Sequence, residues 1–205
     1  MRRNRFDKPG KNSMLERIGP ENTGALSSAS AVIASRATEY EAALMVAHRA
    51  IAMGCGNAFI STAPGIVAAR NEAVRASDGV YVVMLDTDVE LTGHFSFTAG
   101  RKADAGLFVP TYATHSKDAY SRVGVRFANF ANRVGWPFSI GCCMAFLRTA
   151  YDRVGGFDET WAWDDLSMGL RIRQAGFGQS FMPVTATSTR PFTHATKYLE
   201  RVHCD

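Results

Sequence analysis

Short apolar runs and amphipathic segments alternate along the first half of the chain. Runs at residues 31–34, 57–62 and 81–85 predict short strands that are buried on both faces. Between them, apolar residues recur at helical spacing over residues 38–53 and 66–76. This β-α-β-α-β order with short links predicts an α/β domain whose sheet is doubly wound, mostly parallel and flanked by helices.

The second half continues with the same kinds of element. We expect a strand over residues 106–112, a helix over 117–134, an apolar run over 140–146 and a helix over 164–174, with a polar loop after residue 88. The apolar residues of the 117–134 helix form one stripe, which we expect to face the core; a membrane-binding face is the alternative. The stripe consists of Tyr120, Val123, Phe127, Phe130, Ala131 and Val134.

The two ends of the chain lack this periodicity. Residues 1–29 contain several Gly and Pro residues and predict a basic, flexible N-terminal arm. A single domain over residues 30–185 and a polar C-terminal tail over residues 186–205 follow. The arm is a candidate for peripheral membrane contact through anionic lipid, although a solvated arm is the simpler interpretation. Its basic residues are Arg2, Arg3, Arg5, Lys8 and Lys11.

Composition limits the classes of protein. With 205 residues, 46% of them hydrophobic and 20% charged, the chain suits one ordinary globular domain. No apolar run is long enough for a membrane span, and no apolar segment follows the basic first residues, so we expect no secretory signal. The four cysteines lack the spacing of a zinc site and predict reduced, buried thiols. We therefore expect a cytoplasmic protein, with association to the inner face of a membrane as an alternative.

The strand over residues 81–85 ends at two carboxylates, Asp86 and Asp88. Ligands of open α/β sheets bind outside the carboxyl ends of the strands. If the strand continues through both acids, their side chains share one face, because side chains alternate along a strand. Two carboxylates there can hold a hard divalent cation, which in turn can hold a phosphate. The simpler alternative is a solvated exit from the strand that carries two ordinary acids.

An ordered series of motifs resembles the core of a family 2 glycosyltransferase. The series begins with Arg70-Asn71 and Ala76-x-x-Gly79 and runs through the apolar strand into Asp86-Thr-Asp88. It covers roughly residues 65–178, more than half of the chain. The later motifs are Gly141-Cys-Cys-Met-Ala-Phe-Leu-Arg148, Tyr151-x-x-Val-Gly-Gly-Phe-Asp-Glu159, Trp163-Asp-Asp-Leu-x-x-Gly-Leu-Arg171 and Gly176.

The resemblance implies a GT-A fold, a nucleotide-sugar donor and a divalent metal ion, Mn²⁺ or Mg²⁺. By position in the motif, Asp88 would ligate the metal, and Asp86 would contact the donor's ribose or a water molecule on the metal. His194 is a further candidate metal ligand, because some GT-A enzymes supply a histidine late in the chain. The cation would stabilise the negative charge that develops on the departing nucleoside diphosphate.

Asp165 matches the acid that serves as catalytic base in inverting members of the family. A carboxylate opposite the leaving group can take the proton of an acceptor hydroxyl that attacks the anomeric carbon. The family usually has Glu-Asp at this place, whereas this chain has Asp164-Asp165. Asp164 is therefore either a second catalytic acid or a helix N-cap. The resemblance implies direct displacement with inversion.

A further group of residues would bind the donor. Arg70 and Asn71 stand where family members place groups near the nucleotide sugar, and Gly156 belongs to the loop beside the donor and acceptor sugars. Gly141 would let the backbone approach a ligand closely. The full set of donor-binding candidates is Ser35, Arg36, Arg70, Asn71, Gly141 and Gly156.

The chain departs from the family at the loops that read the nucleotide. Residues 34–37 lack the family's Pro-x-x-Asn, and residues 61–64 lack its acidic turn. The resemblance therefore implies a compact member with a shortened nucleotide-binding half, and it leaves the nucleobase open.

Two alternatives follow from the same motifs. A non-catalytic nucleotide-binding or sugar-binding domain is the main one. Asp86-Thr-Asp-Val also resembles phosphatases of the haloacid dehalogenase type, but these carry the motif on their first strand. As partners we expect a nucleotide-sugar donor and a glycan, lipid-linked sugar, protein or small-molecule acceptor, and no nucleic acid.

Overall fold

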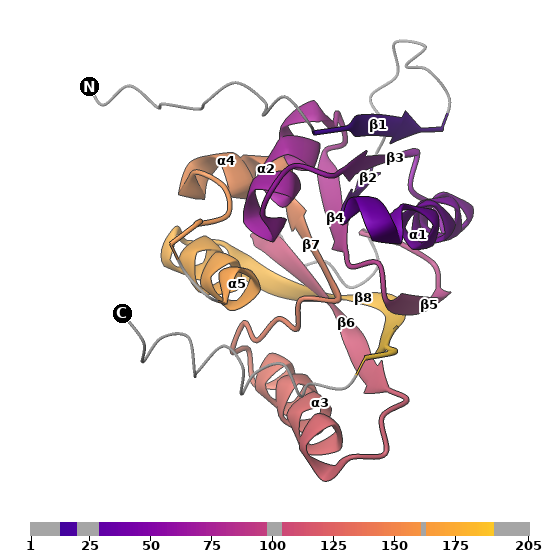
Figure 1. Cartoon of the computed structure of the whole chain (residues 1–205). Helices are drawn as coiled ribbons and strands as arrows, with labels where there is room; N and C mark the ends of the chain where they lie inside the picture. Colours follow the sequence, from indigo (N-terminus) through magenta and orange to yellow (C-terminus); the bar gives the residue numbers. More distant parts are fainter. Residues whose placement is uncertain (1–12, 20–28, 98–103, 161–162, 191–205) are drawn as a thin grey trace, which may run out of the picture.

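The apolar run at the centre of the sequence forms a strand whose five residues are all buried. It belongs to an eight-stranded sheet in a computed structural model, which describes residues 13–19, 29–97, 104–160 and 163–190 (Figure 1). The strands are β1 (Leu15–Ile18), β2 (Ala29–Ala34), β3 (Asn57–Ser61), β4 (Tyr81–Leu85), β5 (Val89–Gly93), β6 (Ala105–Thr114), β7 (Cys143–Leu147) and β8 (Gly178–Ser188).

The order of the strands across the sheet is β1-β3-β2-β4-β7-β6-β8-β5. The pairs β3–β2, β2–β4 and β6–β8 are parallel, and the other neighbours are antiparallel. Five of the eight described strands, β3, β2, β4, β6 and β8, therefore run in one direction. This agrees with the expected mostly parallel sheet; β7 inside the sheet and the edge strands β1 and β5 run in the opposite direction.

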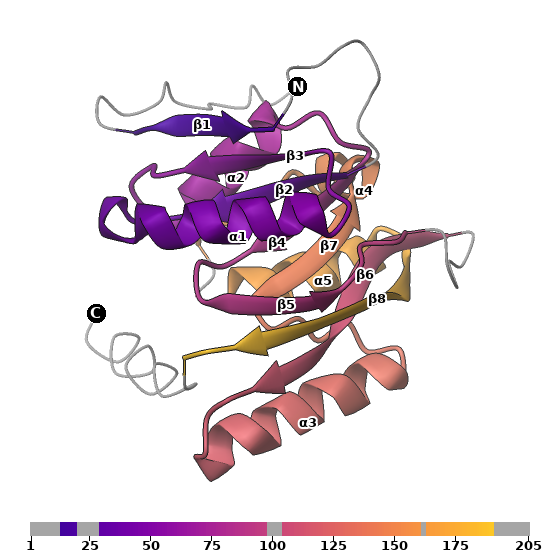
Figure 2. The same cartoon turned by 90° about the vertical axis from the view of Figure 1, so that its right-hand side faces the viewer.

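Helices cover both faces of the sheet. Helix α1 lies in front of β2 and β3, and α2, α4 and α5 lie behind the sheet (Figure 2). A single turn of 3₁₀-helix, η1 (Ala37–Glu39), precedes α1. The helices are α1 (Tyr40–Ala52), α2 (Ile66–Ala76), α3 (Ala119–Arg133), α4 (Arg148–Val154) and α5 (Asp164–Gln174).

Alternation along the central strands produces two cores. Ile33 of β2 and Leu85 of β4 pack on the α1 side, whereas Val32 and Met84 pack on the opposite side with α2, α4 and α5. All four side chains have no exposed surface. This two-sided burial explains why the strands appear in the sequence as unbroken apolar runs rather than as alternating ones.

The structure differs from the expected flexible arm at Leu15–Ile18. This segment forms the edge strand β1, which pairs antiparallel with β3. Arg17 fixes it further, since its guanidinium lies over the ring of Phe59 and within 3.5 Å of Asp78. The other expected parts of the arm, residues 1–12 and 20–28, lie outside the described residues.

Two further segments are more regular than expected. Strand β5 replaces the expected polar loop after residue 88, and it buries Val89 and Leu91 while its other three residues face solvent. Strand β8 runs from Gly178 to Ser188 and crosses the expected domain end at residue 185. Alternate residues of β8 are buried, but several of them, such as Ala186, are small. The apolar pattern of the sequence therefore did not predict the full length of β8.

The orientation of α3 corrects the expectation that its apolar stripe faces the core. Tyr120, Val123, Phe127, Phe130 and Val134 are between 45% and 64% exposed. The helix instead packs on the sheet through smaller side chains, of which only Ala131 belongs to the expected stripe. The buried residues of α3 are Ser121, Val125, Ala128, Ala131 and Asn132.

The described cysteines agree with the expectation of buried thiols. Cys55, Cys142 and Cys143 are free and buried, and burial raises the pKa of Cys55 to about 12. Cys204 lies outside the described residues. In the described part of the chain, no helix has both the length and the apolar character to cross a membrane.

Candidate functional site

A cavity of about 790 Å³ opens at the carboxyl ends of β2, β3 and β4. The segment before β7, the start of α5 and the end of β8 close its other sides. This is the edge at which α/β sheets bind ligands. The cavity brings together seven of the expected site residues: Ser35, Arg36, Arg70, Asp86, Asp88, Gly141 and Asp165.

Arg70 lines this cavity and links Asp86, which also lines it, to Asp164, which does not. The residue is on α2 and is only 5% exposed. One guanidinium nitrogen donates to Asp86 Oδ1 at 2.7 Å, and another donates to Asp164 Oδ2. Its carbon Cζ lies 5.9 Å from the centre of the Phe157 ring, on which the cation is stacked. The arginine thus fixes the end of β4 and the start of α5 relative to each other.

The electrostatics of this cluster favour proton uptake by two of its acids. Burial away from water raises the pKa of Asp165 to about 6, and the neighbouring carboxylates of Asp164 and Asp86 add to this rise while Arg70 opposes it. Burial also raises the pKa of Asp86, again against the opposing effect of Arg70. A carboxyl whose pKa lies near neutrality can exchange protons with a substrate at physiological pH.

Gly141 lies directly against the same acids. A Cβ atom at this position would be 3.3 Å from Asp165 Oδ2 and 3.6 Å from both Arg70 and Asp86 Oδ2. The missing side chain therefore leaves open the space between the expected base and the expected donor contact. The approach of a ligand to the backbone at Gly141 stays a prediction.

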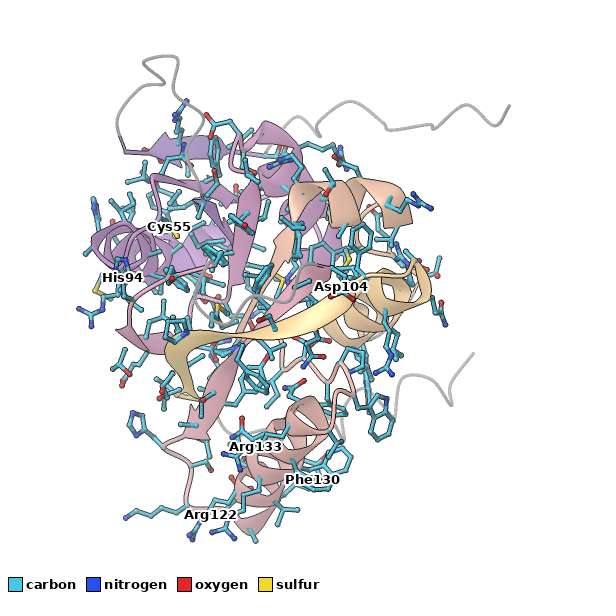
Figure 3. The ribbon with its side chains drawn as sticks, turned by 180° about the vertical axis from the view of Figure 1, so that it is seen from behind. Cys55, His94, Asp104, Arg122, Phe130 and Arg133 are labelled. Carbon is cyan, nitrogen blue, oxygen red and sulfur yellow. The ribbon has the colours of Figure 1, made fainter. Side chains whose placement is uncertain are left out.

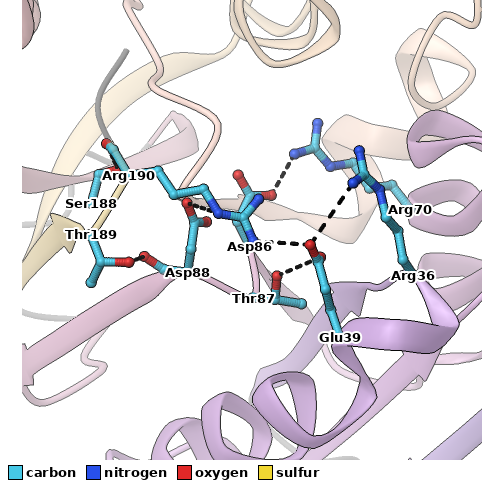
Figure 4. Close-up of polar contacts among 9 residues, drawn as sticks. All are labelled: Arg36, Glu39, Arg70, Asp86, Thr87, Asp88, Ser188, Thr189 and Arg190. Atoms are coloured by element: carbon cyan, nitrogen blue, oxygen red, sulfur yellow. Dashed lines mark hydrogen bonds and ion pairs between the residues drawn. The ribbon is translucent and has the colours of Figure 1, made fainter. Parts of the chain in front are cut away.

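Asp88 belongs to a second ion-pair cluster at the mouth of the cavity (Figure 4). The Arg190 guanidinium lies 3.3 Å from Asp88 Oδ2 and 3.0 Å from Glu39 Oε1. The other oxygen of Glu39 accepts a hydrogen bond from Thr87 at 3.2 Å, and Arg36 lies 4.0 Å from Glu39. Three segments that are far apart in sequence therefore meet around the Asp86–Asp88 turn.

The Asp86–Asp88 turn is held through its backbone as well. The amide of Asp86 donates to Cys142 O at 3.1 Å. The backbone amide and the hydroxyl of Thr189 both donate to Asp88 O, at 3.1 and 2.9 Å. Strand β4 ends at Leu85, so the two acids occupy a turn rather than alternate positions of a continued strand.

The structure gives Asn71 a different place from the one expected. Its side chain lies outside the cavity lining and forms a clamp with the segment after α4. Asn71 Nδ2 donates to Phe157 O at 3.0 Å, while Asn71 Oδ1 accepts from Phe157 N at 2.9 Å and from the Tyr151 hydroxyl at 2.7 Å. Asn71 therefore holds the Gly155-Gly156-Phe157 turn instead of facing a ligand.

Gly156 belongs to the same clamp and is likewise absent from the cavity lining. Its φ of +86° is strained for residues with a side chain, and a Cβ atom would lie 2.8 Å from the Tyr151 hydroxyl. A glycine is required here by the turn and by the closeness of Tyr151. The turn ends at Phe157, whose ring lies under the Arg70 guanidinium. Gly156 therefore affects the site only indirectly, by positioning Phe157.

Two other expectations, for Asp164 and His194, concern the start of α5 and the C-terminal tail. Asp164 is the first residue of α5 and binds Arg70, so it does not act as the side-chain N-cap. Trp163 is 50% exposed and lines the cavity beside Asp165. His194, the expected late metal ligand, lies outside the described residues.

The acids of the cavity fit a divalent cation whose coordination is completed by a ligand. In the described ranges, no group of three or more His, Cys, Asp and Glu side chains is placed to hold a metal ion. Asp86 and Asp88 nevertheless line one cavity with the hard oxygen ligands that Mg²⁺ and Mn²⁺ prefer. Mg²⁺ commonly binds one or two carboxylates together with substrate phosphates.

Sequence patterns did not reveal Glu39 and Arg190 as residues of the site. Glu39 has the position of an ordinary acid in the first turn of a helix, and Arg190 follows the last strand without a motif. Their places in the chain could have indicated them, because Glu39 follows the carboxyl end of β2 and Arg190 follows that of β8. Ligands of α/β sheets bind at such ends.

No protein-family model and no curated protein matches the sequence. Solved structures match the chain, among them the following two. The mannosyltransferase PcManGT from Pyrobaculum calidifontis, in complex with GDP-Man and Mn²⁺, matches 88% of this chain at 16% identity and a TM-score of 0.57. The catalytic domain of Drosophila β1,4-galactosyltransferase 7, in complex with xylobiose, matches 76% at 15% identity and a TM-score of 0.47.

The matched region of this chain spans 62% of the mannosyltransferase and 64% of the galactosyltransferase domain. The likeness to the mannosyltransferase confirms the GT-A type of α/β fold expected from the sequence, and the likeness to the second structure adds no further argument. Membership of glycosyltransferase family 2 stays a prediction.

Proposed function

We propose that the chain is a glycosyltransferase that moves a sugar from a nucleotide-diphosphate donor to an acceptor hydroxyl. The observation that carries the proposal is the arrangement of Asp165 and the Asp86–Asp88 turn around one cavity. At the same place, Asp165 has a pKa raised to about 6, as a general base requires. The GT-A type of fold supports the proposal at the level of architecture.

The donor would bind between the β4 end and the arginines of the cavity. Asp88, together with Asp86, would hold Mn²⁺ or Mg²⁺, and that ion when bound would supply positive charge to the leaving diphosphate. Arg36 also lines the cavity and can pair with phosphate oxygens, because its side chain is 82% exposed. Arg70 is already committed to two acids, so we assign it the positioning of Asp86 and of the α5 start.

The acceptor would react beside Asp165. Its hydroxyl oxygen forms a bond to the anomeric carbon, the bond from that carbon to the diphosphate oxygen breaks, and the hydroxyl proton passes to the Asp165 carboxylate. A single displacement of this kind inverts the configuration of the anomeric carbon. Trp163 offers an exposed aromatic face next to the base, which suits the apolar face of a sugar ring. Asp164 acts through Arg70 rather than on the proton.

The first experiment is a panel of nucleotide-diphosphate sugars, with and without Mn²⁺, in which release of the nucleoside diphosphate is measured. We expect metal-dependent turnover of at least one donor. Asp165→Asn should lower that turnover by about 10²- to 10⁴-fold and leave donor affinity within about threefold. Glu159→Gln, at an exposed acid near the same helix, is the matched control and should be neutral.

Each of the other outcomes selects a different conclusion. Donor binding without any turnover would favour the non-catalytic binding domain over the transferase. Full activity of Asp165→Asn would remove this residue as the base. Retention of the anomeric configuration, read from the NMR spectrum of the product, would exclude direct displacement.

A further inference from the structure

Helix α3 presents large apolar side chains to solvent. Four of them, Tyr120, Val123, Phe130 and Val134, are between 62% and 64% exposed, and Phe127 is 45% exposed. Trp136, directly after the helix, is 51% exposed and meets Phe127 edge to face at 6.1 Å between ring centroids. These six residues form one continuous strip along the helix, which we call the α3 strip. Exposed apolar surface of this extent marks a site of interaction.

The α3 strip does not arise from a loosely attached helix. Asp118 caps the first turn by accepting from Ser121 N at 2.7 Å. The side chain of Asn129 exchanges two hydrogen bonds with the backbone of Tyr112 in β6, at 2.8 and 2.9 Å. The inner face packs on the sheet through small residues such as Ala128, which has no exposed surface. The helix is therefore fixed with its larger apolar side chains outward.

Positive charge lies next to the α3 strip. Arg122, Arg126 and Arg133 are exposed, and helical periodicity places them together on the side of α3 that adjoins the strip. Residues 119–133 contain no acid, and no ion pair is formed by these three arginines with other described residues. Arg122, Phe130 and Arg133 are seen along α3 at the lower edge of the molecule in Figure 3.

The exposed surface continues beyond the end of α3. Val134 and Phe181, which is 44% exposed, both line a second cavity of about 840 Å³. Two arginines, Arg133 and Arg173, line the same cavity. Apolar and basic groups are thus mixed over α3 and the neighbouring part of β8.

We propose that the α3 strip and its arginines bind the surface of an anionic lipid membrane. A strongly amphipathic helix of low average hydrophobicity, with arginines on its polar side and Tyr, Val and Phe on its apolar side, has the composition of a helix that lies in the membrane interface. Tyr120 and Trp136 stand at the two ends of the strip, and both side chains suit the boundary between headgroups and acyl chains.

Charge complementarity favours lipid over a second copy of the chain. Two α3 strips that face each other across a twofold axis would also bring Arg122, Arg126 and Arg133 near their own copies, without an acid on either helix. Anionic headgroups instead neutralise each arginine while the apolar side chains enter the acyl region. The binding is peripheral, through one face of one helix.

The α3 strip is physically connected to the functional cavity. Phe127 of the strip packs edge to face on Phe138 at 5.2 Å between centroids. Phe138 itself lines the cavity, and residues 138–142 continue from it to Gly141 and Cys142. Docking of α3 would therefore place the mouth of the proposed transferase site near the membrane surface, although docking itself does not depend on sugar transfer.

The test is flotation of the full chain with phosphatidylcholine vesicles, with and without phosphatidylglycerol. We expect binding to the anionic vesicles that weakens as salt is raised. Replacing two of the most exposed apolar residues, Val123→Ser together with Phe130→Ser, should weaken partitioning roughly tenfold or more. Arg122→Glu together with Arg126→Glu should abolish the preference for phosphatidylglycerol.

Matched controls lie on other helices of the same chain. Met45→Ser removes an apolar side chain of α1 that is 70% exposed, and Arg153→Glu reverses an exposed charge on α4; neither should change vesicle binding. Wild-type Trp136 should give a blue-shifted emission component on anionic vesicles that is lost in Trp136→Phe.

Absence of binding to anionic vesicles by the wild-type chain would overturn the proposal. So would unchanged binding by both double variants. A dimer in light scattering that Val123→Ser and Phe130→Ser convert to a monomer, without vesicle binding, would assign the strip to a second copy instead. Because vesicle binding is measured without donor or acceptor, its failure leaves the proposed sugar transfer untouched.

Discussion

The guanidinium of Arg70 and the carboxylate of Asp86 lie 2.7 Å apart at the junction of helix α2 and the end of strand β4. The arginine is 5% exposed, and its second contact, to Asp164, brings in the start of α5. One buried cation therefore sets the position of the end of β4 relative to the start of α5. Arg70 Nε is buried without a hydrogen-bond partner among the described residues. The positive charge of Arg70 is therefore balanced by its contacts to Asp86 and Asp164.

Removing this cation should destabilise the fold. We expect Arg70→Met to lower the free energy of unfolding by about 3 kcal/mol, because it leaves the Asp164 carboxylate buried without its partner. Urea unfolding at neutral pH measures the change, with Arg153→Met at an exposed position as the control. Adding Asp164→Leu should restore part of the loss, since no buried charge then lacks a counterion. A loss below about 1 kcal/mol would contradict the prediction.

Asp165 should give the activity an acidic limb. Burial raises its pKa from 3.8 to about 6, and a base has to be deprotonated to act. We therefore expect kcat/KM to rise about tenfold per pH unit below pH 6 and to level off above it. A profile without an inflection between about pH 5 and 7 would contradict this assignment of the base.

The same raised pKa predicts that Asp165→Asn, which should lose activity, gains stability at high pH. The folded protein holds the Asp165 proton more tightly than the unfolded chain, so this group's contribution to stability falls as pH rises from about 4 to about 6. Asp165→Asn removes that penalty. We expect it to be more stable than the wild type by about 1–2 kcal/mol at pH 8, with no gain near pH 4. Urea unfolding at the two pH values measures the difference.

Arg190 should compete with a cation for Asp88. Its guanidinium lies 3.3 Å from the carboxylate that we propose as a metal ligand. Arg190→Gln should therefore strengthen Mn²⁺ binding to the donor-free protein by about two- to fivefold, which corresponds to an ion pair of at most about 1 kcal/mol. Titration followed by Mn²⁺ paramagnetic resonance measures this affinity.

Arg36→Gln is the control for this effect, because Arg36 contacts Glu39 but not Asp88. It should leave Mn²⁺ affinity unchanged. Asp88→Asn should abolish the binding that Arg190→Gln strengthens. Equal gains in the Arg190 and Arg36 variants would mean that general positive charge, and not the pair with Asp88, sets the affinity.

The clamp of Asn71 predicts a graded loss of stability. Tyr151→Phe removes one of the three hydrogen bonds of the Asn71 side chain and should lower the free energy of unfolding by about 1 kcal/mol. Asn71→Leu also leaves the buried backbone N–H and C=O of Phe157 unpaired, so we expect a loss of about 2–4 kcal/mol. Denaturant unfolding of both variants at one pH checks the order, and equal losses would contradict the clamp.

Sequence patterns predicted the central half of the fold well. Helices α2 and α5 have the expected bounds, and β4 ends where the apolar run meets Asp86. Two-sided burial makes such strands continuous in sequence, and their carboxyl ends then locate the cavity. The strand end predicted Asp86 and Asp88 as site residues, and the family resemblance predicted Asp165. All three line one cavity in the structure.

The remaining parts depended on information that local patterns do not contain. Periodicity gave α3 an apolar stripe but could not say whether that stripe faces the sheet, and the small residues opposite it proved to be the buried side. Arg70 and Asn71 are adjacent in sequence, yet consecutive residues of a helix point in different directions, so only one of them reaches the cavity. Arg190 joins the site because the end of β8 pairs with the start of β5, where Ser188 stands opposite Val89, the residue after Asp88.

The tie between Thr189 and the carbonyl of Asp88 has a practical consequence for protein engineering. Both hydrogen bonds of that tie, and the Arg190 pair next to it, come from residues beyond the domain end at residue 185 that the sequence suggests. A truncation at that point would keep every recognisable motif and still detach the acidic turn from its support. Any fusion, loop graft or shortened version of this domain therefore needs the chain through residue 190.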